Sequence, residues 1–521
     1  MTNADVVIVG AGPVGLWSAV LLGRRGLNVL LCDRWPEFYP LPRACGIDHE
    51  VVRMLQSADL GETIAPLLDP IIGADKTYEF VDGQGERLLE VQWNRPGRSG
   101  WAQMNLFFQP DVERHLDACL REMSNVRILR GRTATKLKQD AEGVEVHLKT
   151  SGGIERIRGR YLIGADGANS FVRSTVDIAQ TDLGIAYDWL VIDVVPKVQR
   201  QWKPYVVQHC DVRRPATSVG SGPGRRRWEF MRMPGESLEE LNSAGMAWKL
   251  LAPWDITPET ATLERHAVYT FRGRWAQRWQ ERRVFLAGDS AHLMPPFLAQ
   301  GLCSGMRDAT ALAWRLGMVL QDDASTAILE TYTQERLTRV REIIEQAVEL
   351  GKVICMLDPE DARNRDEQMK MALENPSLAL KPPPEPRLGQ PGILNSGDPQ
   401  SGYLGVQGSV RKGGRTGLLD DLIGRGWQLI SNVDDPRRHL SDVSLQLAER
   451  LGLVTAYVGA PGTEALFEDI HGVYQNWFAQ LRAQAVLVRP DFYVYGVANL
   501  DSLDVLLGGL GEKLGWVHAT A

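Results

Sequence analysis

The stretch DVVIVGAGPVG, residues 5–15, decides the first part of the fold. The apolar, mostly β-branched run from Val6 to Val9 predicts a buried parallel strand. The three glycines that follow have the spacing of a dinucleotide-binding turn. In such a turn Gly10 makes the sharp bend, Gly12 lets a pyrophosphate approach the backbone, and Gly15 lets the next helix pack on the strand.

The residues after this turn complete a strand–helix–strand unit. From Pro13 the pattern is helical, and Gly26 behind two arginines predicts the helix end. A second apolar run, residues 29–32, leads to Asp33, whose carboxylate can bind a ribose diol. The free N–H groups at the start of the helix can bind phosphates. The unit predicts a bound dinucleotide but does not specify which one.

Two later segments are expected to add strands to the same sheet. RYLIGADGANSFVR, residues 160–173, and VFLAGD, residues 284–289, each contain a strand that leads to an acid. Parallel strands bring their carboxyl ends to one crevice, which is where ligands bind in such sheets. The residues between these two segments therefore belong to an inserted domain.

Composition narrows the function classes. The chain has 521 residues and a net charge of −7, which argues against a nucleic-acid surface. Its six cysteines form no CxxC pair or metal-ligand pattern and are typical of a reducing compartment, so we expect a cytoplasmic protein without a metal site. The N-terminus lacks the basic start of a signal peptide, and no apolar run is long enough for a membrane span.

Three motifs in this order carry a resemblance to a known family. GAGPVG at 10–15, DGANSFVR at 166–173 and GDSAHLMPPFLAQG at 288–301 resemble the class A FAD-dependent aromatic hydroxylases. The similarity is greatest to the 3-(3-hydroxyphenyl)propionate hydroxylase type and the aromatic polyketide hydroxylases. It implies noncovalent FAD, reduction by NAD(P)H, and transfer of oxygen from a flavin C4a-hydroperoxide to a phenolic ring.

The resemblance also assigns residues to the cofactor. Asp289 would contact the ribityl and pyrophosphate part, Pro295 and Pro296 would form a wall beside the flavin ring, and the N–H groups near Gly301 would face its pyrimidine edge. Leu298-Ala299 stands where the family commonly has a small, glycine-containing pair. The predicted cofactor-binding residues are Gly10, Gly12, Pro13, Gly15, Asp33, Arg34, Arg43, Gln109, Asp166, Gly167, Gly288, Asp289, Pro296, Gly301, Leu302 and Cys303.

The middle of the chain is expected to hold the substrate. Residues 181–275 are rich in strand-like runs and predict a sheet laid over the flavin. Alternation along a strand would place Trp228, Phe230 and Arg232 on one face, where with Pro295 they could bind an aromatic acid. An internal acid could instead pair with Arg232. His209, Tyr187 and His49 are candidates for the base that deprotonates a phenol.

The fold class expected is α/β, with a Rossmann-like FAD domain, an inserted mixed sheet and a thioredoxin-like C-terminal domain. The predicted ranges are 1–180 and 276–360 for the FAD domain, 181–275 for the insertion, 361–402 for a Pro/Gly-rich linker and 403–521 for the C-terminal domain. The last domain contains no cysteine, which favours a packing role or a homodimer contact.

Three functions remain open. The first is hydroxylation of a small aromatic substrate with NAD(P)H and O2. The second keeps the flavin but carries out Baeyer–Villiger or epoxidising chemistry on a polycyclic aromatic. Product analysis separates these two. The third is a flavin-binding regulatory protein without turnover, which would be yellow and would bleach slowly with NADPH whatever aromatic is added.

Overall fold

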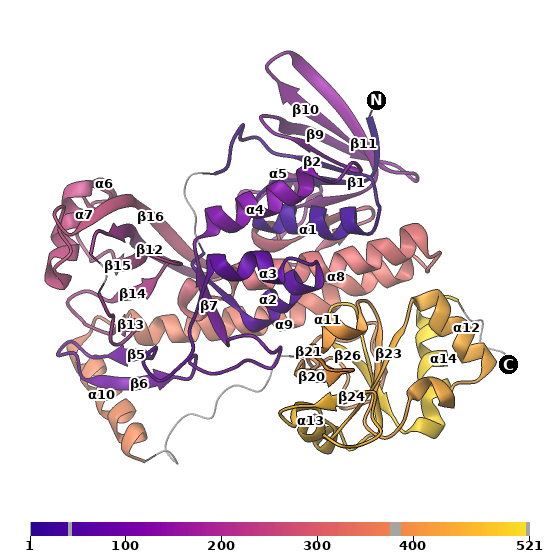
Figure 1. Ribbon diagram of the computed structural model, residues 1–521. Coiled ribbons are helices and arrows are strands. Elements are labelled where there is room, and N and C mark those ends of the chain that lie inside the picture. The colour runs from indigo at the N-terminus through magenta and orange to yellow at the C-terminus, as the bar shows by residue number, and fades with distance from the viewer. Residues whose placement is uncertain (1, 40–43, 199, 376–386, 517–521) are drawn as a thin grey trace.

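The computed structural model describes residues 2–39, 44–198, 200–375 and 387–516. Figure 1 shows two sheet-containing regions on either side of a central group of helices, with the C-terminal region packed beneath them. Among the described helices, none is both long and apolar enough to cross a membrane.

The first sheet contains the predicted parallel strands. Its path runs β17-β18-β11-β1-β2-β8, and β1 pairs in parallel with both β11 and β2. The strands predicted near residues 6, 29, 161 and 284 all lie in this one sheet, which confirms their common crevice. Its strands are β1 (Thr2–Val9), β2 (Val29–Cys32), β8 (Val126–Leu129), β9 (Thr133–Gln139), β10 (Val144–Thr150), β11 (Gly153–Gly164), β17 (Gln280–Glu281) and β18 (Val284–Leu286).

Helices pack on this sheet because their apolar faces need cover. α1 (Pro13–Arg24) ends just before Gly26, which has a positive φ of 80°, as the sequence predicts. α8 (Gly301–Gln321) packs along α1, and the long helix α9 (Ala327–Ile354) follows it and packs on α8. The smaller elements are β3 (Gly46–Asp48), α2 (His49–Ser57), α3 (Gly61–Ile64), η1 (Ala65–Leu67), β4 (Leu68–Pro70), β7 (Met104–Phe107), α4 (Gln109–Arg121) and α5 (Phe171–Thr175).

The second sheet has the order β19-β16-β12-β15-β14-β13-β5-β6. Its central strands come from the predicted insertion, but β5, β6 and β19 come from outside residues 181–275. Helices α6 (Leu238–Leu241) and α7 (Ala244–Leu251), followed by η2 (Ala252–Trp254), cover its outer face. The strands are β5 (Tyr78–Val81), β6 (Arg87–Val91), β12 (Gln180–Pro196), β13 (Val206–His209), β14 (Ala216–Gly220), β15 (Arg226–Met231), β16 (Ala261–Ala276) and β19 (His292–Leu293).

The C-terminal region has a seven-stranded mixed sheet of its own, after α10 (Pro359–Glu374). The sheet order is β21-β20-β24-β23-β22-β25-β26. Its elements are β20 (Ser409–Lys412), β21 (Arg415–Leu418), α11 (Leu419–Ile423), β22 (Gln428–Ser431), η6 (Pro436–His439), α12 (Asp442–Leu451), β23 (Val454–Gly459), β24 (Phe467–Asp469), α13 (Val473–Leu481), β25 (Ala485–Val488), β26 (Val494–Ala498), η7 (Leu500–Ser502) and α14 (Leu503–Lys513).

Candidate active site

The glycine turn between β1 and α1 leaves no space for side chains at two of its positions. Gly10 has a φ of 105°, and a Cβ built there would lie 2.3 Å from the carbonyl oxygen of Ala165. A Cβ at Gly15 would lie 1.8 Å from the carbonyl oxygen of Gly10, so the helix packs directly on the turn. A Cβ built at Gly12 would meet no described heavy atom within 4 Å beyond the chain neighbours of this residue. The open side of the turn is therefore at Gly12.

Asp33 fastens the end of β2 to this turn. Its carboxylate accepts hydrogen bonds from the backbone N–H groups of Ala11, at 2.6 Å, and Trp35, at 2.7 Å. The exposed side chain of Arg34 lies over the ring of Trp35, with 5.6 Å to the ring centroid. Arg43, also predicted to contact the cofactor, lies outside the described residues.

Asp166 stabilises the start of α5. Its carboxylate accepts hydrogen bonds from the Ser170 hydroxyl at 2.5 Å and from the Val172 N–H at 3.0 Å. Burial raises the pKa of this carboxyl, and the hydrogen bonds offset part of the effect. Gly167 beside it has a φ of 82° and open space where a Cβ would be, so a ligand could approach the backbone there.

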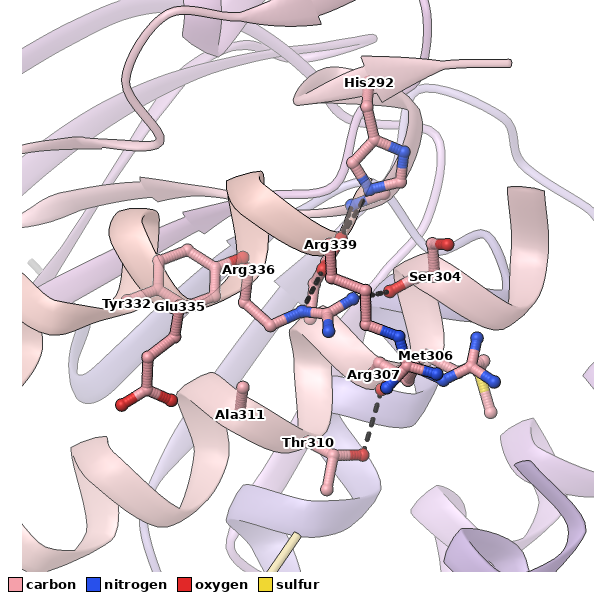
Figure 2. A network of polar contacts seen from close by, with 12 residues as sticks. His292, Ser304, Met306, Arg307, Thr310, Ala311, Tyr332, Glu335, Arg336 and Arg339 are labelled. Atoms are coloured by element: carbon pink, nitrogen blue, oxygen red, sulfur yellow. Dashed lines mark hydrogen bonds and ion pairs between the residues drawn. The ribbon is translucent and has the colours of Figure 1, made fainter. Parts of the chain in front are cut away.

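The loop at residues 288–292, which contains η3 (Gly288–Ser290), is held from below by a buried acid on α8. The carboxylate of Asp308 accepts hydrogen bonds from the Gly288 N–H at 3.0 Å and from Arg336 at 2.9 Å, and it lies 2.7 Å from His292 Nε2. Figure 2 shows Arg336 extending from α9 towards Ser304 and His292 beyond it. His292 therefore anchors the loop, while Asp289 stands half-buried at its surface.

A rigid entry leads into α8. Pro295 and η4 (Pro296–Leu298) precede Ala299, which has a φ of 53° in the left-handed region. An L-residue in that conformation costs roughly 1–2 kcal/mol, and the family's usual glycine at this pair would avoid that cost. No side chain in the described part of the chain caps α8 at Gln300. The first-turn N–H groups, from Gly301, Leu302 and Cys303, are thus free of a local side-chain partner.

Gln109 joins α4 to the loop before β3. Its Oε1 accepts a hydrogen bond from the Ala44 N–H at 3.0 Å, and its Nε2 donates to Glu113 at 2.8 Å. Gln109, which is predicted to bind the cofactor, therefore positions the loop that follows residues 40–43.

The inner face of the second sheet packs on the proline loop. Phe297 lies against Trp189 and Phe271, with ring centroids 5.8 and 6.0 Å apart. Met231 and Tyr187 belong to the same apolar cluster. This face of the sheet is the one that covers the predicted flavin position.

Trp228 and Phe230 lie on the opposite face, which does not favour their predicted role in the substrate site. Both are buried against the helices on the outer side, where their rings contact Trp254. Arg232 follows the end of β15 and forms an ion pair with Asp188 at 3.3 Å, with 36% of its side chain exposed. Arg232 therefore has an internal acid as its partner, which is the alternative that the sequence left open, and this pairing does not favour a role in binding a substrate carboxylate.

The inner face instead carries a buried charge cluster, which consists of Asp193, Arg227, Glu229 and Arg265. Asp193 accepts a hydrogen bond from Arg227 Nε at 2.7 Å and another from Arg265. Glu229 lies 3.7 Å from Arg227 and is 13% exposed. Burial raises the pKa of Glu229, with Arg227 opposing the effect. Sequence reasoning missed this cluster because its members come from three strands whose register is not visible in the chain.

The three candidate bases lie in different surroundings. His209 stacks edge-on against Trp254, at 5.5 Å, on the outer face of the sheet, which does not favour its predicted role as the base. His49 begins α2, and burial lowers its pKa. Tyr187 lies near the proline loop, beside Phe297 and Gly351, and burial raises its pKa. The structure does not bring the three together.

The helix starts and glycine turns described above fit a bound FAD molecule. α1 and α8 begin without side-chain caps in the described chain, and the turns at Gly12 and Gly167 have open space where a ligand can approach the backbone. When bound, FAD would supply the redox chemistry, and the chain would supply binding and orientation.

Comparisons with known proteins agree with this fit. A family model described as "FAD binding domain" matches residues 3–347, and one described as "HcaD C-terminal domain" matches residues 402–513. The chain is 36% identical to a probable NADH-specific resorcinol 4-hydroxylase of Rhodococcus jostii, over 98% of this chain and 94% of that protein. It is 31% identical to a 3-(3-hydroxy-phenyl)propionate/3-hydroxycinnamic acid hydroxylase of Paraburkholderia xenovorans, over 98% and 91%.

Solved structures share the fold. The flavin-dependent monooxygenase PieE, in complex with FAD and substrate, superposes with a TM-score of 0.81 at 21% identity over 99% of both chains. Aklavinone-11 hydroxylase, in a ternary complex with FAD and aklavinone, gives a TM-score of 0.76 at 24% identity, again over 99% of both chains. The chain therefore belongs to the FAD-dependent aromatic hydroxylases, flavoprotein monooxygenases that use a nicotinamide cofactor.

Proposed function

We propose that this chain hydroxylates a phenol with a second substituent meta to the ring hydroxyl, using O2 and NADH. One observation carries the proposal: two relatives that match 98% of the chain are named for substrates of this pattern, resorcinol and 3-(3-hydroxyphenyl)propionate. The name of the Rhodococcus relative also specifies NADH. A phenol hydroxyl donates electron density to its ring, which makes the ring a suitable oxygen acceptor.

A neutral diphenol fits the inner sheet face better than a carboxylate does. Each guanidinium of the buried charge cluster already has an acid as its partner: Arg227 pairs with Asp193 and Glu229, and Arg265 pairs with Asp193. Burying a further carboxylate there would leave a charge without compensation. We therefore place resorcinol-like substrates ahead of aromatic acids.

We propose that the cofactor lies along the crevice between β1, β11 and α8. The side chains and backbone that would hold it are Gly10, Gly12, Pro13, Gly15, Asp33, Arg34, Gln109, Gly167, Asp289, Pro296, Gly301, Leu302 and Cys303. Pro295 and Phe297 would border the ring together with Trp189. Tyr187 is the remaining candidate near the substrate, and its raised pKa favours a hydrogen-bond donor rather than a base at neutral pH.

We propose a thioredoxin-like fold for residues 403–521, from the mixed sheet with helices packed on it, and keep the predicted domain ranges. Six free cysteines accord with a cytoplasmic location. We also propose that the protein forms a homodimer, which analytical ultracentrifugation would test.

The test is a panel of phenols, scored for NADH oxidation, hydrogen peroxide and oxygenated product together. Resorcinol should accelerate NADH oxidation and yield a trihydroxybenzene with little peroxide, and NADPH should be a poorer reductant. Slow NADH oxidation that no aromatic accelerates would support the regulatory alternative. A lactone, ester or epoxide as the product would support the second enzymatic alternative.

A further inference from the structure

The C-terminal region contributes one side chain to the polar network beneath the predicted flavin loop. Tyr493, immediately before β26, is 2% exposed. Its hydroxyl donates a hydrogen bond to Glu50 Oε1 on α2 at 2.5 Å and accepts one from Arg339 on α9. Arg339 also donates to Glu50 Oε2 at 3.3 Å. Tyr493 thus bonds at once to two elements of the FAD domain.

From Glu50 the network continues to the start of α8. Arg307 donates to Glu50 Oε2 at 2.6 Å, forms an ion pair with Asp48, and donates to Gln300 Oε1 at 2.9 Å. Gln300 Nε2 in turn donates to Asp48 Oδ2 at 3.1 Å. Gln300 is the residue before the uncapped first turn of α8, so Tyr493 is linked to that turn through Glu50, Arg307 and Gln300, each joined to the next by a hydrogen bond.

The network is balanced in charge and almost dry. Two acids, Asp48 and Glu50, face two guanidinium groups, Arg307 and Arg339, and none of the four side chains is more than 7% exposed. Burial alone would raise the pKa of Glu50, but Arg307 and Arg339 outweigh it and lower that pKa. Removing a donor from such a group leaves a buried charge undersatisfied, and the remaining partners must shift to compensate.

We propose that Tyr493 is a positioning residue, through which the C-terminal region fixes Gln300 and thereby the N–H end of α8 against the flavin. The inference rests on the proposed placement of FAD at that end of α8. A helix N-terminus stabilises negative charge, and reduced flavin carries such a charge. Displacing the start of α8 should therefore weaken the binding of reduced flavin more than that of oxidised flavin.

The test compares Tyr493→Phe with Tyr495→Phe in the full-length holoenzyme. Both tyrosines are nearly fully buried and only two residues apart, but the Tyr495 hydroxyl lies against Gly509 in α14, away from the network. We expect Tyr493→Phe to weaken FAD binding about tenfold, in line with the loss of a hydrogen bond to a charged group. We also expect a more negative midpoint potential of the bound flavin, whereas Tyr495→Phe should change neither.

A double-mutant cycle with Gln300→Ala tests the route. If Tyr493 acts through Gln300, the effects of the two substitutions on flavin potential should be clearly less than additive. Additive effects, or equal potentials in Tyr493→Phe and Tyr495→Phe, would overturn the inference. A wild-type protein that fails to bind FAD would instead refute the proposed function, so the two failures are distinguishable.

Discussion

Arg53 on α2 and Asp420 on α11 form a buried, two-pronged ion pair. Arg53 Nε lies 2.7 Å from Asp420 Oδ2 and its second nitrogen 3.1 Å from Oδ1, with side-chain exposures of 1% and 4%. Arg53 also lies over the ring of Phe492, 4.2 Å from its centroid. An ion pair that is shielded from water thus joins the C-terminal region to the FAD domain.

Asp420→Asn should therefore destabilise the whole protein. The substitution leaves the Arg53 guanidinium buried without its charge partner, which costs about 3–5 kcal/mol in comparable pairs. Urea unfolding measures the loss. The matched control is Glu345→Gln, which breaks the exposed Arg341–Glu345 pair and should cost less than about 1 kcal/mol. Equal midpoints for the two variants would show that the domains are not coupled through this pair.

Gly12→Ala should separate cofactor binding from folding. The backbone at Gly12 has an ordinary φ of −76°, and a Cβ there meets no described heavy atom within 4 Å beyond its chain neighbours. The apoprotein should thus keep its melting temperature, while FAD titration should show affinity at least tenfold weaker if the pyrophosphate occupies that space. Gly245→Ala, at an exposed position of α7, is the control and should leave FAD affinity unchanged. Unchanged FAD affinity in Gly12→Ala would place the pyrophosphate elsewhere.

Local patterns were enough to predict the FAD half of the molecule. The glycine spacing, the strand ends at Asp33 and Asp289 and the helix after the proline loop depend on residues close together in the chain, and the sheet pairing confirms their common crevice. The side chains that face the substrate were harder to predict from the sequence. Alternation along the strand shows that Trp228 and Phe230 share a face, but it does not show which face of the sheet covers the proline loop. Partners such as Asp308 for His292 depend on tertiary contacts between distant segments.

Arg232→Leu should have no selective effect on acidic substrates. Its guanidinium pairs with Asp188 and donates to the Glu236 carbonyl oxygen at 3.3 Å, at a partly exposed position. The variant should change kcat/KM by less than about twofold, and to the same extent for a phenol carrying a carboxylate and for its neutral analogue. Selective loss of tenfold or more on the acid would mean that Arg232 reaches the substrate after all.

His209→Gln should make the fold less sensitive to acid. Burial lowers the pKa of His209 to about 4, with Asp211 opposing the effect, and among the described residues its Nε2 has no hydrogen-bond partner. In the unfolded chain the pKa is about 6.5. Between these values the unfolded chain binds a proton that the folded chain does not, so stability falls as pH decreases from about 6.5 to 4.

The difference between the unfolding free energies of wild type and variant isolates this group from the acids that titrate nearby. We expect wild type to lose about 1–3 kcal/mol more than His209→Gln between pH 7 and pH 4. His471→Gln, at an exposed position, should follow wild type. Because His209 lies on the outer face of the sheet, the variant should also keep its hydroxylation rate at pH 7. A large loss of kcat without loss of stability would restore His209 as the base, and the assignment of the inner sheet face to the substrate would then be wrong.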